Sequence, residues 1–285
     1  MALEAAHTKR GDRAKRRRQP GHSDSGRGSE KEYIEAGADI LVTNTLQASS
    51  ISLKRYNHSE DAYEITYKAA KILKDIPEVK YIGGCIGPTT GEFKEWAMDP
   101  TKAYTEDEFY AAYKEQVRAF KDAGVDLVIC KTFFILPELR AALRASKDYD
   151  MITAVSLAFN YFEKTDDFAT IYGAKIDDLI SLNDADIIGF NCGSVTPDQA
   201  VELTVRFRKK TDKPLFVEPN GGLPGNQDQV YTPDVFATYF EKIIEAGGTL
   251  VGGCCGTTPG HIRALKKIVD LQNLGTIYRP KKWRL

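Results

Sequence analysis

Short apolar runs alternate with helix-type patterns along most of the chain. The runs begin near residues 38, 79, 125, 151, 186, 214 and 249, about 35 residues apart, and polar or glycine-rich residues follow each one. Their apolar centres are continuous rather than alternating, which is typical of parallel strands covered on both faces. The segments between them, near 61–74, 106–123, 137–146, 176–182, 197–210 and 233–246, have helical patterns. A further helical stretch, 29–37, precedes the first run and ends at a glycine.

This strict alternation predicts an α/β fold with a parallel sheet and right-handed crossovers. We favour a (β/α)8 TIM-type barrel, because polar residues cluster after every predicted strand and such loops share one face of a barrel. A doubly wound open sheet is the alternative. An eighth strand should precede the helix at 29–37, yet residues 1–28 supply no candidate for it. The first strand is therefore expected to be missing or replaced.

Residues 1–28 differ in composition from the rest of the chain. Seven basic residues and a single acid, Asp12, lie between Lys9 and Arg18, and no Val, Ile, Phe, Trp or Tyr occurs before Tyr33. Such a segment contributes little to a core. We expect a disordered or non-native basic segment at 1–28, with a nucleic-acid arm or localisation signal as the alternative, and one barrel domain over 29–285.

The overall composition excludes several classes of protein. The net charge of −1 gives no indication of nucleic-acid binding, and no apolar run approaches the ~20 residues that span a bilayer. Five cysteines, an odd number, do not suggest a disulfide framework. We therefore expect a cytoplasmic protein with reduced thiols and no membrane partner.

Three of these cysteines lie at the ends of two predicted strands. Cys192 closes the apolar strand that ends Gly189-Phe190-Asn191, and Cys254 and Cys255 follow Gly252-Gly253 after another. In a barrel these strand ends would lie two strands apart, within reach of one ion. The sequence therefore predicts a metal site, with a pair of inert buried thiols as the alternative.

The ligand type limits the metal and its chemistry. Three thiolates suit zinc, and a fourth position left open is typical of a catalytic site, whereas a closed structural site would need a fourth Cys or His. Three thiolates give the zinc centre a net negative charge, which makes it a poor activator of water, so a hydrolytic barrel is disfavoured. Such a centre is suited to holding an incoming thiol as a nucleophilic thiolate. The expected reaction is attack of that sulfur on a methyl group.

These motifs resemble those of the homocysteine S-methyltransferase family, which includes the homocysteine-binding module of cobalamin-dependent methionine synthase and the betaine and S-methylmethionine enzymes. The main matches are Gly189-Phe190-Asn191-Cys192 and Gly252-Gly253-Cys254-Cys255-Gly256-Thr257-Thr258-Pro259, with further matches at 36–45, 86–92 and 218–224. The similarity runs from about Glu30 to Ile268. It implies a (β/α)8 barrel, Zn2+ on Cys192, Cys254 and Cys255, and homocysteine sulfur as the fourth ligand. The substrate contacts that it implies are Asn44, Lys131, Thr132, Asn191 and Asn220.

Asn220 is the candidate for an oxygen that takes the fourth position before substrate binds. Its alternative is a turn residue before Gly221-Gly222. Two departures from the family pattern concern the amino-acid end of the substrate. The family's first strand ends in an Asp-Gly-rich motif that is absent here. Lys131 stands where the family has a Glu that pairs with the homocysteine ammonium, so it would repel that group, unless it only extends to solvent at the barrel rim.

The resemblance identifies a zinc-dependent S-methyltransferase that converts homocysteine to methionine. The methyl donor is open between a sulfonium, a betaine and a methylcorrinoid protein. Aromatic and acidic residues after the fourth predicted run, which would be the fifth strand of a complete barrel, lie at 159–168 and mark one place where a donor could approach. The alternative function is a lapsed paralogue that binds zinc and a thiol without turnover.

Overall fold

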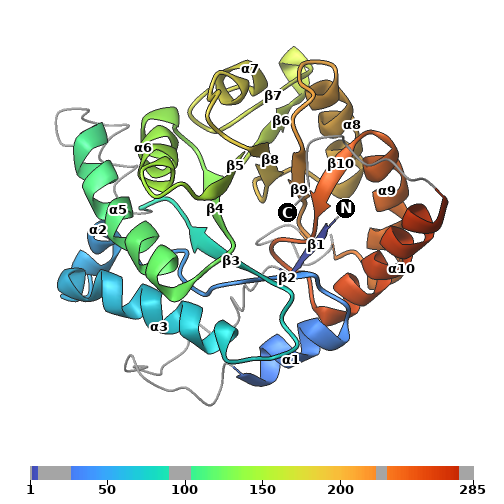
Figure 1. Ribbon diagram of the computed structural model, residues 1–285. Helices are drawn as coiled ribbons and strands as arrows, with labels where there is room; N and C mark the ends of the chain where they lie inside the picture. Colours follow the sequence, from blue (N-terminus) through green and yellow to red (C-terminus); the bar gives the residue numbers. More distant parts are fainter. Residues whose placement is uncertain (1, 6–26, 90–103, 223–229, 276–285) are drawn as a thin grey trace.

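A closed barrel of parallel strands forms the centre of the protein, and helices surround it (Figure 1). The computed structural model describes residues 2–5, 27–89, 104–222 and 230–275. The strands follow one another around the barrel in the order β1-β10-β9-β8-β5-β4-β3-β2. Their bounds are β1 (Ala2–Ala5), β2 (Ile40–Val42), β3 (Tyr81–Ile86), β4 (Leu127–Phe133), β5 (Ile152–Leu157), β8 (Ile187–Asn191), β9 (Leu215–Glu218) and β10 (Gly248–Val251).

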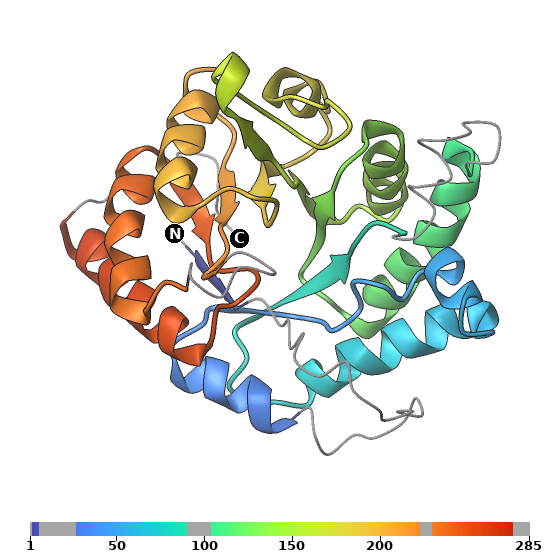
Figure 2. The ribbon, with the colours of Figure 1, turned by 180° about the vertical axis from the view of Figure 1, so that it is seen from behind.

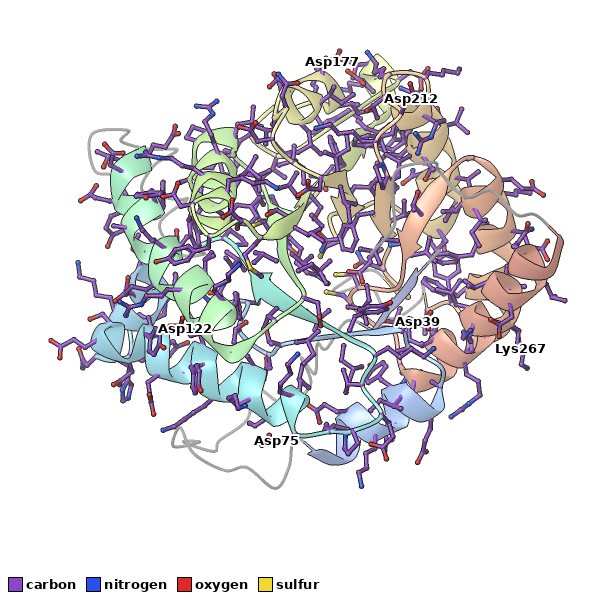
Figure 3. All side chains as sticks on the ribbon, viewed as in Figure 1. Asp39, Asp75, Asp122, Asp177, Asp212 and Lys267 are labelled. Carbon is purple, nitrogen blue, oxygen red and sulfur yellow. The ribbon has the colours of Figure 1, made fainter. Side chains whose placement is uncertain are left out.

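The helices form an outer ring, which the view from behind shows equally well (Figure 2). They are α1 (Arg27–Glu35), α2 (Ser50–Lys54), α3 (Ala62–Lys74), α5 (Glu106–Ala123), α6 (Leu136–Lys147), α7 (Ile176–Ile180), α8 (Pro197–Arg208), α9 (Pro233–Glu245) and α10 (Pro259–Gly275). A 3-10 turn, η1 (Ser59–Asp61), precedes α3. The labelled charged side chains Asp75, Asp122 and Lys267 lie on the outside of this ring (Figure 3). None of the helices in the described ranges is long and apolar enough to cross a membrane.

The predicted alternation of strands and helices is confirmed, and the open-sheet alternative is wrong because the sheet closes on itself. Local signals fixed the helix ends well. The helix α5 begins at a capping box in which Thr105 and Glu108 exchange hydrogen bonds, and it ends at Gly124, whose φ is 75°. The helix α1 likewise ends just before Gly37, whose φ is 93°. A glycine adopts this left-handed conformation without the steric penalty of a Cβ.

The first strand is replaced rather than missing. Strand β1 pairs in parallel with β10 through Ala2 and Leu3, and with β2 through Glu4 and Ala5. The expectation that residues 1–28 supply no strand is therefore corrected. It was based on the lack of β-branched and aromatic residues, but the edges of β2 and β10 carry backbone groups that need partners, and even a four-residue segment provides them. Residues 6–26 lie outside the described residues, so the basic segment remains a prediction.

The side chains of the strands divide into two apolar clusters, as alternation along a strand requires. One cluster lies between the sheet and the helices and contains Val128 and Cys130 of β4. The other fills the barrel and contains Leu127 and Ile129 of the same strand, together with Phe216 of β9 and others. Lys131, the next inward position of β4, therefore lies above an apolar interior.

A small antiparallel hairpin follows β5 and was not predicted. Strands β6 (Asn160–Phe162) and β7 (Asp167–Ala169) pair with each other and not with the barrel. The hydroxyl of Tyr161 donates to Asp166 at 2.9 Å, and Arg206 of α8 also bonds to that carboxylate at 2.9 Å. These contacts fix part of the aromatic and acidic segment at 159–168 against α8.

Candidate metal centre

Three cysteine sulfurs meet at the carboxyl end of the barrel strands. Cys192 follows β8, and Cys254 and Cys255 follow β10, with β9 between the two strands (Figure 1). The three Sγ atoms lie within 4.8 Å of one another, and those of Cys192 and Cys255 are 3.8 Å apart. None of the three takes part in a disulfide bond. The structure thus brings together the three residues that the sequence predicted as metal ligands.

Backbone turns aim these sulfurs at one point. The backbone N–H of Cys192 donates to the carbonyl of Glu218 at 3.2 Å, and that of Cys254 donates to the carbonyl of Pro219 at 2.9 Å. Cys192 and Gly193 both have left-handed φ values, 58° and 66°. Such a conformation is uncommon for a residue with a Cβ and costs about 1–3 kcal/mol, which the surrounding contacts must offset. The chain turns sharply here, so that the thiol of Cys192 faces the β10 loop.

Gly193 is the most constrained point of this turn. A Cβ at this position would lie 1.9 Å from the carbonyl oxygen of Phe159, on a φ of 66°. We expect Gly193→Ala to lower the free energy of unfolding and to weaken metal binding, because the turn that carries Cys192 must move. Gly173→Ala is the matched control, since Gly173 also has a positive φ, 86°, but a Cβ there would meet no atom within 4 Å.

Gly173→Ala should lower the free energy of unfolding by about 1 kcal/mol, because alanine is strained in the left-handed conformation. Gly193→Ala should cost about 1–3 kcal/mol more, from overpacking against the backbone. Urea unfolding of both variants measures the difference. Equal losses in the two variants would show that the Phe159 contact does not constrain the turn.

The electrostatics of the three thiols favour a bound cation. Hydrogen bonding with the sulfurs of Cys254 and Cys255, together with burial, raises the pKa of Cys192 well above its usual range. For Cys254, the hydrogen bond with Cys192 lowers the thiol pKa, but Cys255 and burial raise it, and the net shift is upward. Three thiols this close, one of them buried and two partly exposed, do not ionise together unless a positive charge compensates them. The donor set therefore fits a metal ion that prefers sulfur ligands.

The other candidate ligands are engaged elsewhere. His261 is buried, and its Nδ1 contacts the Thr258 hydroxyl at 3.0 Å while its Nε2 contacts the Tyr231 carbonyl at 2.8 Å. Cys85 and Cys130 are buried within strands, as predicted, and neither belongs to the group of possible metal ligands among the described residues. A closed site with a fourth Cys or His is thus not what the described residues form.

Asn220 links the two cysteine loops. Its side-chain oxygen accepts the backbone N–H of Cys255 at 3.2 Å, and its amide nitrogen donates to the Gly193 carbonyl at 3.0 Å. The side chain is almost fully buried. These contacts give Asn220 a part in holding the loops together, and its role as an oxygen ligand remains a prediction.

Lys131 forms a buried ion pair, and its charge acts on the nearby Cys254 thiol. Its Nζ lies 2.5 Å from the carboxylate of Glu218, and the side chains are only 6% and 0% exposed. The ammonium also lies 5.7 Å from the centre of the Phe216 ring, inside the barrel. The alternative that Lys131 extends to solvent at the rim is therefore wrong. Strands β5 and β8 separate β4 from β9, so this pair reaches across the barrel interior.

Glu218 is the residue that the sequence analysis missed. It appeared only as part of a matched motif, and its charge was not considered. The signal was present: Leu215-Phe216-Val217-Glu218 is an apolar run with an acid at its carboxyl end, and alternation places Glu218 on the same inward face as Phe216. The sequence does not indicate that Glu218 pairs with Lys131.

Asn191 and Thr132, two predicted substrate contacts, bond to each other. The backbone N–H of Thr132 donates to Asn191 Oδ1 at 2.7 Å, and Asn191 Nδ2 donates to Thr132 Oγ1 at 2.7 Å. Asn191 is fully buried, whereas Thr132 is partly exposed. The φ of Thr132 is 68°, a true outlier for a β-branched residue. The pair of hydrogen bonds holds this strained turn at the end of β4.

Asn44 lies apart from this network. It is exposed in the turn after β2, at the same end of the barrel. Its role as a substrate contact remains a prediction. Residues 90–92 and 223–224, the last parts of two matched motifs, lie outside the described residues. The first of these motifs is anchored at Thr89, whose N–H donates to the buried carboxylate of Glu138 at 2.8 Å.

Comparison with known proteins agrees with this geometry. The family model described as homocysteine S-methyltransferase matches residues 22–269. The metallated form of the homocysteine methyltransferase MmuM from Escherichia coli superposes with a TM-score of 0.65 at 22% identity, covering 85% of this chain and 83% of that one. The oxidized form gives 0.66 with the same identity and coverage. The apo form gives 0.62 at 22% identity, covering 93% and 94%. At this identity, the likeness to solved structures establishes the barrel fold.

Proposed function

The chain belongs to the homocysteine S-methyltransferase family, and we propose that it methylates the sulfur of homocysteine at a zinc ion held by Cys192, Cys254 and Cys255. The observation that carries the proposal is the convergence of three cysteine sulfurs within 4.8 Å at the active-site end of a barrel. Zinc at this place would lower the pKa of the acceptor thiol and leave its sulfur nucleophilic. The product is then methionine.

The protein's own residues supply binding and orientation. The three cysteines provide the sulfur ligands, and the loops after β8, β9 and β10 fix their positions through the backbone bonds of Cys192 and Cys254. The buried Lys131–Glu218 pair offers an ammonium, whose charge acts on Cys254, and a carboxylate, on the residue whose carbonyl accepts from the Cys192 N–H. We propose that these two groups receive the carboxylate and the ammonium of the acceptor, so that a zwitterion matches the site better than a singly charged thiol.

The ion pair with Glu218 changes the role that we expect for Lys131 in substrate binding. Taken alone, a lysine in this position would repel the ammonium of homocysteine. Paired with Glu218, it is one half of a neutral ion pair, and the carboxylate of Glu218 can bind the ammonium of homocysteine. The methyl donor remains open between a sulfonium, a betaine and a methylcorrinoid protein, and a screen of all three with zinc-loaded protein selects among them. A reducing compartment such as the cytoplasm would keep the three thiols available.

Homocysteine should add a fourth sulfur to the zinc environment. X-ray absorption at the zinc edge is expected to show an oxygen or nitrogen neighbour replaced by sulfur, with release of a proton to the buffer, because the thiolate is the species that binds. An unchanged shell of three sulfurs at saturating homocysteine would count against thiol activation.

Two homocysteine analogues test whether the Lys131–Glu218 pair binds the ammonium and the carboxylate of the acceptor. We expect 4-mercaptobutyrate, which lacks the ammonium, and 3-mercaptopropylamine, which lacks the carboxylate, each to bind about 10-fold or more weaker than homocysteine, since each loses one charge-assisted hydrogen bond. Titration calorimetry on zinc-loaded protein measures this. Equal affinities for all three thiols would mean that the Lys131–Glu218 pair does not contact the acceptor.

A further inference from the structure

The side chain of Asn191 connects the metal centre to two other strands. Its Oδ1 accepts from the Thr132 backbone N–H at 2.7 Å and from the Ser156 hydroxyl at 2.6 Å. Its Nδ2 donates to Thr132 Oγ1 at 2.7 Å and to the Sγ of Cys254 at 3.5 Å. Asn191 itself is completely buried. One amide group thus joins the ends of β4, β5 and β8 to a sulfur of the β10 loop.

These four contacts use the full capacity of the amide. Two acceptor positions on the oxygen and two hydrogens on the nitrogen are each assigned to a partner. The orientation of the amide is therefore fixed, because the Thr132 N–H can only donate and must face Oδ1. The nitrogen is consequently directed toward Thr132 Oγ1 and Cys254. An Asn that served only to fill space would not need this complete set of partners.

We propose that Asn191 is a positioning residue of the metal centre, which holds the Cys254 sulfur in place by donating its amide N–H to it. The inference rests on the proposed function, because it assumes a metal ion at the three sulfurs. An N–H donor stabilises a thiolate by accepting part of its charge, and it keeps the sulfur directed toward the ion. Partners that orient metal ligands in this way commonly change metal affinity by ~10–100-fold.

The substitution Asn191→Asp tests this role most directly. An aspartate has the shape of asparagine, and one carboxylate oxygen can still accept from the Thr132 N–H and the Ser156 hydroxyl. The other oxygen would face the Cys254 sulfur, so a donor is exchanged for a negative charge. Ser156→Ala is the matched control, because it removes a contact of the same amide and leaves the amide nitrogen and its bond to Cys254 untouched.

Cobalt(II) reports on the sulfur ligands without any need for turnover. We would load wild-type and variant proteins with Co2+, record the sulfur-to-cobalt charge-transfer absorption, and measure affinity against a chromophoric chelator. Asn191→Asp should weaken Co2+ binding by ~10–100-fold and move the charge-transfer band to lower energy, since the thiolate loses its hydrogen bond. Ser156→Ala should bind Co2+ within ~3-fold of wild type with an unshifted band.

Asn191→Ala is a second variant, which lacks both the donor and the added charge. It should shift the band in the same direction by a smaller amount, and it keeps the test available if Asn191→Asp does not fold. Near-UV circular dichroism identifies the folded variants. A folded Asn191 variant with the wild-type band and affinity, and only a lower melting temperature, would overturn the positioning role while leaving the proposed function intact. Wild-type protein that takes up no Co2+ would overturn the metal centre and this inference together.

Discussion

The substitution of Ser for any one of Cys192, Cys254 or Cys255 is expected to abolish stable metal binding. The purified, reduced protein should bind about one zinc ion per chain, held by the three sulfurs that lie within 4.8 Å of one another. Loss of a direct ligand should exceed the ~100-fold upper effect of changes around a metal site. A serine hydroxyl remains protonated at neutral pH, so it cannot replace the thiolate. Metal content by mass spectrometry and competition with a chelator measure the effect.

Cys85→Ala is the control for this series. Cys85 is buried within β3 and its thiol is not among the grouped sulfurs, so its loss should lower stability slightly and leave metal binding unchanged. If Cys85→Ala removed the metal while Cys192→Ser retained it, the site would have been assigned to the wrong cysteines. Zinc should also leave the wild-type protein as the pH falls, because protons compete for the same sulfurs.

The second large effect is expected from Lys131→Glu, which should destabilise the protein severely. In the wild type, the Lys131 ammonium lies 2.5 Å from the Glu218 carboxylate, and both side chains are buried. The variant places two carboxylates together in the barrel interior without a counter-charge. Removing one partner of a buried pair costs about 3–5 kcal/mol, and a like charge adds to that loss. Urea unfolding at pH 7 measures the free energy, and acidification should recover part of it as one carboxyl takes up a proton.

Two double variants separate pairing from burial. The exchange Lys131→Glu with Glu218→Lys restores an ion pair and should recover much of the lost stability. The neutral combination Lys131→Met with Glu218→Gln removes both charges and should be far more stable than either single variant, because no uncompensated charge remains. Single-variant losses that simply add in the doubles would mean that the two residues do not interact. Full stability of Lys131→Glu would contradict the buried pair itself.

The neutral pair also explains how a lysine can occupy this position in a homocysteine S-methyltransferase. From the sequence, Lys131 is expected to be either a repulsive charge or a side chain extended to solvent. The carboxylate it meets is 87 positions further along the chain. Nothing in the local pattern of either strand indicates this contact, because it depends on which inward positions of β4 and β9 face each other across the closed barrel.

The helix and strand positions could be predicted because their signals are local. Thr105 with Glu108 marks the start of α5, and Gly124 marks its end, through contacts within a few residues. Strand boundaries differ from the predicted ones by at most three residues, and β2 is shorter than the apolar run that predicted it. The β6–β7 hairpin was missed because its two short strands pair only with each other and carry no strong turn signal.

The sequence by itself determined the alternating barrel and the cysteine site, since apolar periodicity sets the strands and a glycine-rich turn places each thiol at a strand end. Only the tertiary structure decided the first strand and the contacts among residues at the carboxyl ends of the other strands. Strand β1 forms because the edges of β2 and β10 offer it backbone partners, not because its residues favour a strand. Lys131 meets Glu218, and Asn191 meets Cys254, because barrel closure brings distant strand ends together. Interactions of this kind depend on spatial proximity across the closed sheet, and a one-dimensional pattern does not contain that information.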